Sequence, residues 1–350
     1  METRPLGDTD QRVSVFGLGC MTFGGQTDEA DAMRQLDRAF DAGITLYDTA
    51  ENYPTPLAAA TQGRSEEILG RWIRRRGVRA QVVVATKVAG PGQAAGDLRH
   101  IRGESRRLDA TNINAAVEGS LRRLGTDCID LYQVHWAERA VTTLGRSRYS
   151  RLPDAPGQVP IEDTLDALAA QVRAGRIRRF GVCNESAWGA MRYLAAARER
   201  NLPRIVSIQN AYSLLDRHFE QGLAEVAVRE RAGLLAHSPL AGGTLTGKYG
   251  GRPAALAGSR SSQSAAFLAR LSEARLRAID AYVALAQAHG VPPAHLALAF
   301  VRQQPFTTSV LLAASSVTQL QANLGVVDVV LPREVVQAVN AIHDRHPNPA

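Results

Sequence analysis

The stretch Ile44-Thr45-Leu46-Tyr47-Asp48-Thr49-Ala50-Glu51-Asn52-Tyr53 joins a short apolar run to an acid and a phenol. The run formed by Ile44, Leu46 and Tyr47 is typical of a short buried strand. Asp48 therefore stands at the carboxyl end of this strand, and Tyr53 follows five residues later in the loop. A tyrosine in such a loop can donate a proton if a neighbouring group lowers its pKa from about 10 towards neutrality.

Short apolar runs alternate with amphipathic helical patterns along the whole chain. We expect eight strands, over residues 13–20, 45–48, 81–87, 129–135, 178–184, 205–210, 234–238 and 309–313. We expect helices over residues 28–42, 64–76, 112–124, 161–174, 187–200, 219–231, 272–289, 294–303, 317–324 and 333–346. This alternation predicts a parallel sheet, and eight repeats favour a closed (β/α)8 TIM barrel over an open sheet.

A barrel of this kind typically needs about 250 residues, so the chain, at 350 residues, is longer than the fold requires. We assign the excess to an N-terminal extension, to long loops after strands three, four and seven, and to a C-terminal helix. We find no low-complexity linker and no sign of a second core in the sequence. We therefore expect residues 1–350 to form a single domain.

The composition argues against several classes of protein. The first twelve residues are polar, so we expect no signal peptide. No segment approaches the ~20 apolar residues that span a bilayer, so we expect no membrane partner. The three cysteines are odd in number and far apart, which fits a reducing compartment and favours the cytoplasm. The net charge of +7 comes from scattered residues, which indicates no nucleic-acid partner and only a modest preference for anionic ligands.

The two lysines are an unusual feature of the composition. Lysine and arginine together number 41, yet Lys87 and Lys248 are the only lysines. Lysine is a compact donor whose pKa can shift, whereas arginine is a planar fork that stays charged. A lysine kept in such a chain is a candidate for a position where arginine would not serve.

Polar or ionisable residues follow most of the predicted strands, which is where a barrel carries its active site. The strand ends read Cys20-Met21-Thr22, Asp48, Lys87, His135, Asn184, Gln209-Asn210, Ser238 and Ala313-Ala314-Ser315. If strands two, three and four are neighbours, the side chains of Asp48, Tyr53, Lys87 and His135 converge. We call these four residues the tetrad.

The tetrad has the chemistry of a carbonyl-reducing site. The positive charge of Lys87 would favour the Tyr53 phenolate, and Asp48 would hold Lys87 in place. A neutral His135 could donate a hydrogen bond to a substrate oxygen and orient it. Each residue alone also has a structural explanation, as a helix cap, a half-buried ring, a strand-end cation or a packed imidazole. We expect no metal here.

Several motifs resemble those of a known family. They are residues 48–53, Ala85-Thr86-Lys87, Asp130-Leu131-Tyr132-Gln133-Val134-His135-Trp136, the opening 17–24, Gly181-Val182-Cys183-Asn184, residues 209–215 and residues 239–249. Together they resemble the aldo-keto reductases from about residue 10 to the C-terminus. Within that family, Thr61-Gln62-Gly63, the segment 137–160 and residues 302–306 look most like the bacterial Tas-type reductases.

The resemblance implies an NADP(H)-dependent oxidoreductase that reduces an aldehyde or ketone. Tyr53 would be the general acid, Lys87 and Asp48 would lower its pKa, and His135 would orient the substrate. Hydride would pass from the nicotinamide to the carbonyl carbon while Tyr53 protonates the oxygen. The implied cofactor contacts are Met21, Thr22, Asp48, Asn184, Gln209, Tyr212, Ser238, Leu240, Gly242, Lys248, Arg260, Ser315, Gln319 and Asn323.

Some of these implied roles are specific. Asn184 and Gln209 would hold the nicotinamide carboxamide, and Tyr212 would stack on the nicotinamide ring. The residues 238–248 support a cofactor independently, because small residues let backbone amides approach a pyrophosphate and Lys248 adds a positive charge. A plain flexible connection would also explain this loop. Gly17-Leu18-Gly19 lacks a third glycine at position 22 and is not a Rossmann fingerprint.

The 2′-phosphate site departs from the family pattern. Many relatives have glycine where Ala313 stands and a basic residue near Ser315 or Ser316. Ser315, Gln319 and a helix N-terminus could still bind phosphate, and Arg260 could supply the charge. We expect NADP(H), with NAD(H) as the alternative.

Phe23 and Trp136 are candidate walls of the substrate pocket, whereas we assign Trp188 to core packing. The arginines at positions 139, 146, 148 and 151 give the segment 137–160 a positive charge. This segment either covers an acidic substrate or is a solvated insertion. Cys183 stands where the family usually has serine, and we expect no redox role for it.

Two other functions compete with carbonyl reduction. Lys87 at a strand end could instead form a Schiff base in a barrel aldolase or lyase. A cofactor-binding regulatory subunit, similar to the channel β-subunits of the same superfamily, would bind NADP(H) with little turnover. The complete tetrad favours the reductase.

Overall fold

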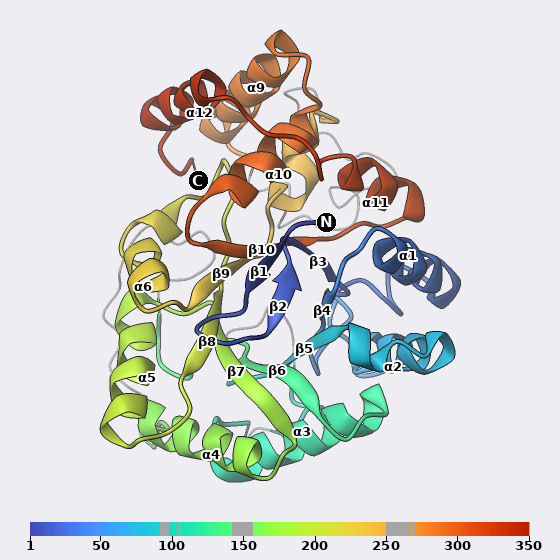
Figure 1. Ribbon diagram of the computed structural model, residues 1–350, viewed down its shortest axis with the longest axis vertical. Helices are drawn as coiled ribbons and strands as arrows, with labels where there is room; N and C mark the ends of the chain where they lie inside the picture. Colours follow the sequence, from blue (N-terminus) through green and yellow to red (C-terminus); the bar gives the residue numbers. More distant parts are fainter. Residues whose placement is uncertain (92–97, 104–105, 142–156, 250–266, 268–270, 350) are drawn as a thin grey trace.

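The computed structural model describes residues 1–91, 98–103, 106–141, 157–249, 267 and 271–349. Eight parallel strands close into a barrel, in the order β10-β3-β4-β5-β6-β7-β8-β9 (Figure 1). The strands are β3 (Phe16–Gly19), β4 (Leu46–Asp48), β5 (Val83–Val88), β6 (Ile129–Val134), β7 (Ile177–Cys183), β8 (Ile205–Gln209), β9 (Gly233–Ala236) and β10 (Thr307–Leu312). The predicted (β/α)8 barrel is confirmed, with each strand apart from the first within two residues of its expected bounds.

The helices surround the barrel and follow the strands in order (Figure 1). They are α1 (Glu29–Asp41), α2 (Arg64–Arg76), α3 (Ala110–Leu124), α4 (Ile161–Arg173), α5 (Ala187–Glu199), α6 (Leu223–Arg229), α9 (Glu273–Ala288), α10 (Pro293–Gln303), α11 (Val317–Leu324) and α12 (Arg333–Arg345). Capping residues mark the helix ends. The Asp28 side chain accepts from the amide of Asp31 at the start of α1, and Gly125 ends α3 with a φ of 64°. The predicted C-terminal helix is α12, which packs beside α9.

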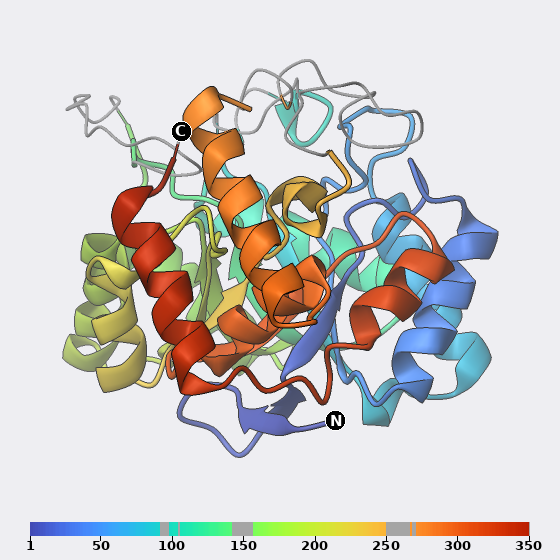
Figure 2. The same ribbon diagram turned by 90° about the horizontal axis from the view of Figure 1, so that it is seen from above.

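The prediction of one strand over residues 13–20 was wrong. The chain forms an antiparallel hairpin of β1 (Thr3–Pro5) and β2 (Arg12–Ser14), and β3 begins only at Phe16. Leu6, between the two hairpin strands, is fully buried in a cluster with the barrel residues Leu46 and Val206. The hairpin therefore closes the amino-terminal end of the barrel, where Figure 2 shows it in blue. The apolar run is interrupted because Val13 pairs with Arg4 of β1 rather than with a barrel strand.

The helix expected over residues 219–231 is shorter than predicted. A three-residue 3-10 turn (His218–Glu220) comes first, and α6 begins at Leu223. Gly222 separates the two with a φ of 104°, a conformation that residues with a side chain rarely adopt. This break keeps Phe219 in the core while α6 packs against β9 and α5.

The barrel interior is apolar in its middle layer and polar in the layer nearest the carboxyl ends of the strands. Leu46, Ala85 and Leu131 form part of one buried cluster, and each stands two residues before Asp48, Lys87 or Gln133 on its own strand. Since side chains on one face of a strand recur every second residue, the polar groups form the next layer up. We call the carboxyl end of the barrel, where this layer lies, the mouth. Among the described residues, none of the helices combines the length and the apolar character that crossing a bilayer requires.

The close approach of α2 and α3 generates a testable prediction. A Cβ atom added to Gly70 of α2 would lie 2.2 Å from the carbonyl oxygen of Leu124. Alanine is normally favoured over glycine in a helix by about 1 kcal/mol. Here we expect Gly70→Ala to lower the free energy of unfolding by about 1–3 kcal/mol, because backbone must move to make room.

Urea denaturation of Gly119→Ala on α3 provides the matched control. The nearest atoms to a Cβ there belong to the end of the Arg123 side chain, the closest at 3.0 Å. We expect this variant to lose much less stability than Gly70→Ala. Equal losses in the two variants would show that the packing of α2 on α3 does not depend on Gly70.

Candidate active site

The structure brings the four side chains of the tetrad together at the mouth. The Lys87 ammonium donates to Asp48 Oδ2 at 2.6 Å and to the Thr49 carbonyl at 2.8 Å. Lys87 Nζ lies 5.1 Å from the centre of the Tyr53 ring. The Tyr53 hydroxyl lies 3.4 Å from His135 Nε2, and the two rings meet edge to face. β4, β5 and β6 are neighbours in the barrel, as this convergence requires.

Asp48 is held by two glutamines as well as by Lys87. Its Oδ1 accepts from Gln133 Nε2 at 3.1 Å and from Gln209 Nε2 at 2.8 Å. Gln209 also donates to Gln133 Oε1 at 3.2 Å. Gln133 is not among the residues predicted from the sequence, although the sequence carries a signal for it. It is a polar residue inside an apolar strand, two positions before His135, and so lies on the same face.

Burial and the charge of the neighbouring group act in opposite directions on the pKa values of Lys87 and Tyr53. Burial is the largest influence on Lys87 and lowers its pKa, but Asp48, Tyr53 and Cys183 together outweigh burial, so the pKa is raised and Lys87 stays charged. For Tyr53, burial is the largest influence and raises the pKa to about 12, although Lys87 acts to lower it. The expectation of a lowered Tyr53 pKa is therefore not met. Tyr53 is a protonated phenol across the neutral range, as a proton donor must be.

His135 is a neutral imidazole at the same place. It is 7% exposed, and its pKa is lowered well below the usual value, first by burial and then by Lys87. Its Nδ1 is buried without a hydrogen-bond partner among the described residues. Nε2 is the nitrogen that lies near the Tyr53 hydroxyl.

The loop after β7 and the start of the loop after β9 meet beside the tetrad. Asn184, with a φ of 52°, donates through Nδ2 to the His135 carbonyl at 3.0 Å. Its Oδ1 lies 3.1 Å from Nε2 of His237, a residue not predicted from the sequence. His237 follows β9 directly and is half-buried, so its imidazole is the ring that this strand supplies to the mouth. Ser238, next in sequence, is exposed.

Two aromatic residues expected at the site lie in the core instead. Tyr212 is fully buried, packs against Phe219, Phe300 and Phe306, and bonds to Glu220 through its hydroxyl. It has no surface on which a nicotinamide could stack. Phe23 is also fully buried and belongs to the main core cluster, so it cannot line a substrate pocket.

Trp136 lies closer to the predicted place. Its ring centre is 4.6 Å from that of His135, and its Nε1 donates to the Pro91 carbonyl at 2.9 Å. The ring is 6% exposed and packs in a small cluster with Ala89, Leu98 and Ile101. Trp136 thus packs against His135 and exposes little surface to the mouth.

The glycine-rich loop after β9 has the backbone of an anion cradle. Positive φ values occur at Ser238, Ala241, Gly242 and Gly243, so amides point in directions that a regular strand or helix does not allow. A Cβ atom on Gly243 would lie 3.1 Å from Lys248 Nζ. Lys248 is exposed, so its charge is available to a ligand.

The start of α11 is the expected phosphate site. Ser316 caps the helix by accepting from the Gln319 amide, and the Gln319 side chain accepts from the Ser315 hydroxyl at 3.0 Å. Asn323 is buried at 7% exposure one turn later. Arg260, expected to supply the positive charge, lies outside the described residues.

The remaining expected contacts lie on the loops nearest the mouth. Met21 and Thr22, after β3, are half-buried, as are Leu240 and Gly242 after β9. The Thr22 hydroxyl lies 2.9 Å from that of Thr27. Within the described part of the chain, no three His, Cys, Asp or Glu side chains gather as a metal site would require.

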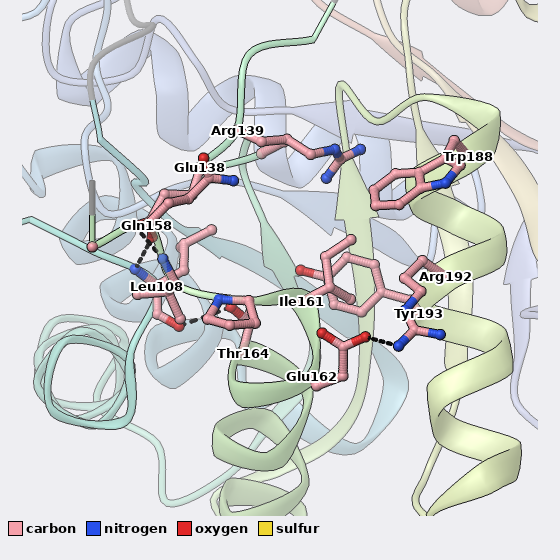
Figure 3. Close-up of a pocket in the computed structure, with 14 residues that line it drawn as sticks. Leu108, Glu138, Arg139, Gln158, Ile161, Glu162, Thr164, Trp188, Arg192 and Tyr193 are labelled. Carbon is pink, nitrogen blue, oxygen red and sulfur yellow. Dashed lines mark hydrogen bonds and ion pairs between the residues drawn. The ribbon is translucent and has the colours of Figure 1, made fainter. Parts of the chain in front are cut away.

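A pocket of about 360 Å³ lies outside the barrel, between the loop after β6, α4 and α5 (Figure 3). It contains none of the tetrad. Trp188 borders it and is 64% exposed, so its assignment to the core was wrong. Arg139 lies over the Trp188 ring at 5.0 Å and pairs with the buried Glu185. The charge of Arg139 is therefore already balanced by Glu185. The other arginines of this segment, at positions 146, 148 and 151, lie outside the described residues.

The comparisons with known proteins agree with this geometry. The aldo/keto reductase family model matches residues 15–344. The chain belongs to the aldo/keto reductase family. It is 46% identical to Protein tas of Escherichia coli over the full length of both chains.

More distant relatives cover nearly the whole chain as well. An uncharacterized oxidoreductase of Bacillus subtilis, YrpG, is 33% identical over 98% of this chain and 96% of its own. A probable voltage-gated potassium channel subunit beta of rice is 30% identical over 99% of this chain and 98% of its own. Membership in this family supports an oxidoreductase that uses a nicotinamide cofactor.

The environment of His237 predicts a pH dependence of stability. Burial, and then Lys87, lowers the pKa of His237 to about 4, whereas an unfolded chain has the ordinary value of about 6.5. Between these values the unfolded chain binds the proton and the folded chain does not, so stability falls as the pH drops from about 6.5 to about 4.

We expect His237→Gln to make the urea midpoint less sensitive to pH across this window, compared with the wild type. His289→Gln, which changes an exposed histidine at the end of α9, is the matched control and should follow the wild-type curve. A wild-type slope that His237→Gln leaves unchanged would contradict this account of the site.

Proposed function

We propose that the protein is an NADP(H)-dependent reductase that converts an aldehyde or ketone to an alcohol, with Tyr53 as the general acid. The observation that carries the proposal is the place of Tyr53. Its ring lies 5.1 Å from the Lys87 ammonium, and its hydroxyl lies 3.4 Å from His135 Nε2. A carbonyl oxygen between these two donors would be polarised by His135 and protonated by Tyr53.

The chain's own residues would move and replace the proton. The separation of 3.4 Å is longer than a good hydrogen bond, so both groups are able to turn to a third atom. When Tyr53 gives up its proton, the phenolate forms beside the buried Lys87 cation. The positive charge stabilises that product, while Asp48 keeps Lys87 in place through a contact of 2.6 Å.

The residues at the mouth suit a nicotinamide dinucleotide. When bound, the cofactor supplies the hydride to the carbonyl carbon. Asn184 and Gln209 would hold the carboxamide, and we assign the stacking role expected of Tyr212 to His237. The loop of Ser238, Leu240, Gly242 and Lys248 would hold the pyrophosphate through backbone amides and one cation.

The phosphate preference is part of the proposal. Ser315, Gln319 and the N-terminus of α11 offer hydrogen-bond donors to a 2′-phosphate, and Arg260 would provide the positive charge. NADP(H) is therefore proposed ahead of NAD(H). The three cysteines are free, which supports a reducing compartment such as the cytoplasm.

The environment of Lys87 argues against the aldolase alternative. A Schiff-base lysine must be reachable and must lose its proton. Lys87 is fully buried, is paired with Asp48 and has a raised pKa, so it meets neither condition. A regulatory subunit remains the second candidate, since one relative carries a channel-subunit name.

Replacing the proposed acid separates these functions. We expect Tyr53→Phe to lower the rate of carbonyl-dependent NADPH oxidation by about 10²–10⁴-fold, because general acid catalysis contributes about this much. Cofactor affinity, measured by NADPH fluorescence, should stay within a few-fold of wild type.

Lys248→Ala should give the opposite pattern, with cofactor affinity lost first. Turnover that survives in Tyr53→Phe would remove Tyr53 from the role of acid. Tight NADPH binding by the wild type without turnover on a panel of aldehydes, ketones and quinones would favour the regulatory subunit.

A further inference from the structure

The buried Glu51 and the half-buried Arg102 form an ion pair to which the proposed mechanism gives no role. Glu51 is 2% exposed, and each of its carboxylate oxygens accepts from Arg102, at 2.6 Å from Nη1 and 2.8 Å from Nη2. Arg102 also donates through Nε to Asn112 Oδ1 at 3.1 Å, in the first turn of α3. A bidentate pair of this kind fixes orientation as well as distance.

The Glu51 carboxylate connects the segments that carry the acid and the cation. Its Oε1 accepts from the backbone amide of Ala89 at 2.6 Å, two residues beyond Lys87. Glu51 itself stands two residues before Tyr53, and its own amide donates to the Lys87 carbonyl at 3.3 Å. One side chain thus fixes the loop after β4 against the end of β5.

The Tyr53 side chain lies against Lys87, whose ammonium is 5.1 Å from the ring centre, and meets the His135 ring edge to face. Its hydrogen bond to His135 Nε2 is long, at 3.4 Å. The backbone of Tyr53 bonds to Ala50 and Gly63, both in the segment that follows β4. These contacts lie within that segment. The Thr55 amide ties it to the Met21 carbonyl at 2.9 Å in the loop after β3, and the Glu51 carboxylate ties it to Ala89 beyond the end of β5.

We propose that Glu51 and Arg102 are positioning residues, which set the place of the Tyr53 hydroxyl relative to Lys87 and His135. This inference rests on the proposed carbonyl reduction. Neither residue contacts the reacting atoms. They act on Tyr53 through the backbone of its loop, and a misplacement of about 1 Å can cost about 100-fold in rate.

Glu51→Gln tests the proposal. The amide keeps an oxygen for Ala89 but removes the charge and one of the two acceptors for Arg102. We expect kcat for carbonyl reduction to fall by about 10–100-fold, while the Kd for NADPH stays within a few-fold. A residue with a purely structural role would lower the yield of folded protein without this loss of kcat.

A second buried pair provides the matched control. Glu66 on α2 is fully buried, and its side chain accepts from Arg123 Nε at 2.6 Å and from the Thr86 hydroxyl at 2.6 Å rather than from the loop of Tyr53. Glu66→Gln should lower the urea midpoint about as much as Glu51→Gln does, with kcat retained. Equal losses of kcat in the two variants would overturn the proposal.

The double variant Glu51→Gln/Arg102→Gln covers the case in which the single variant does not fold. It removes both charges together, so neither is left buried without a partner. We expect this variant to fold and to keep the low kcat. Wild-type kcat in the folded double variant would overturn the proposal.

A readout without turnover separates this proposal from the proposed reduction. The 13C signal of the Tyr53 ring carbon that bears the hydroxyl, assigned by comparison with Tyr53→Phe, reports its surroundings directly. It should shift in Glu51→Gln and stay in place in Glu66→Gln. If the wild type reduces no carbonyl but the signal still shifts in Glu51→Gln, the proposed reduction is refuted and the positioning role is kept. An unchanged signal in Glu51→Gln would refute the positioning role.

Discussion

The contact between Lys87 and Asp48 is the interaction on which the rest of the site depends. Lys87 has no exposed surface, and an unpaired buried charge would be far too costly to keep. The Asp48 carboxylate at 2.6 Å balances the charge, and the Lys87 ammonium donates a second hydrogen bond to the Thr49 carbonyl. Gln133 and Gln209 then satisfy the other carboxylate oxygen. The result is a fixed cation beside a phenol that stays protonated.

The barrel supplies the rigidity that this buried pair requires. Asp48, Lys87 and Gln133 each follow an apolar residue of the interior cluster by two positions. The strand periodicity therefore places three polar side chains in one layer, directly above a dry core. The N-terminal hairpin closes the opposite end around Leu6, so the polar layer has the mouth as its route to solvent.

Much of this arrangement was predictable from sequence because it depends on local patterns. Strand ends, helix caps and the tetrad follow from periodicity and from residues at fixed offsets. The hairpin was missed because Val13 continues the apolar run of β3 while pairing elsewhere. Tyr212 was misplaced because a family motif does not say which way a side chain turns. The pair of Glu51 and Arg102 joins residues 51 positions apart, and no local pattern links them.

The central claim is that the buried pair makes Tyr53 an effective acid, and one measurement tests it most directly. The double variant Lys87→Met/Asp48→Asn removes both charges at once and leaves Tyr53 and His135 in place. Single-turnover NADPH oxidation with a carbonyl substrate should be slower by about 10²–10⁴-fold in this variant, provided that circular dichroism shows it folded. A folded double variant that oxidises NADPH at the wild-type rate would contradict the account.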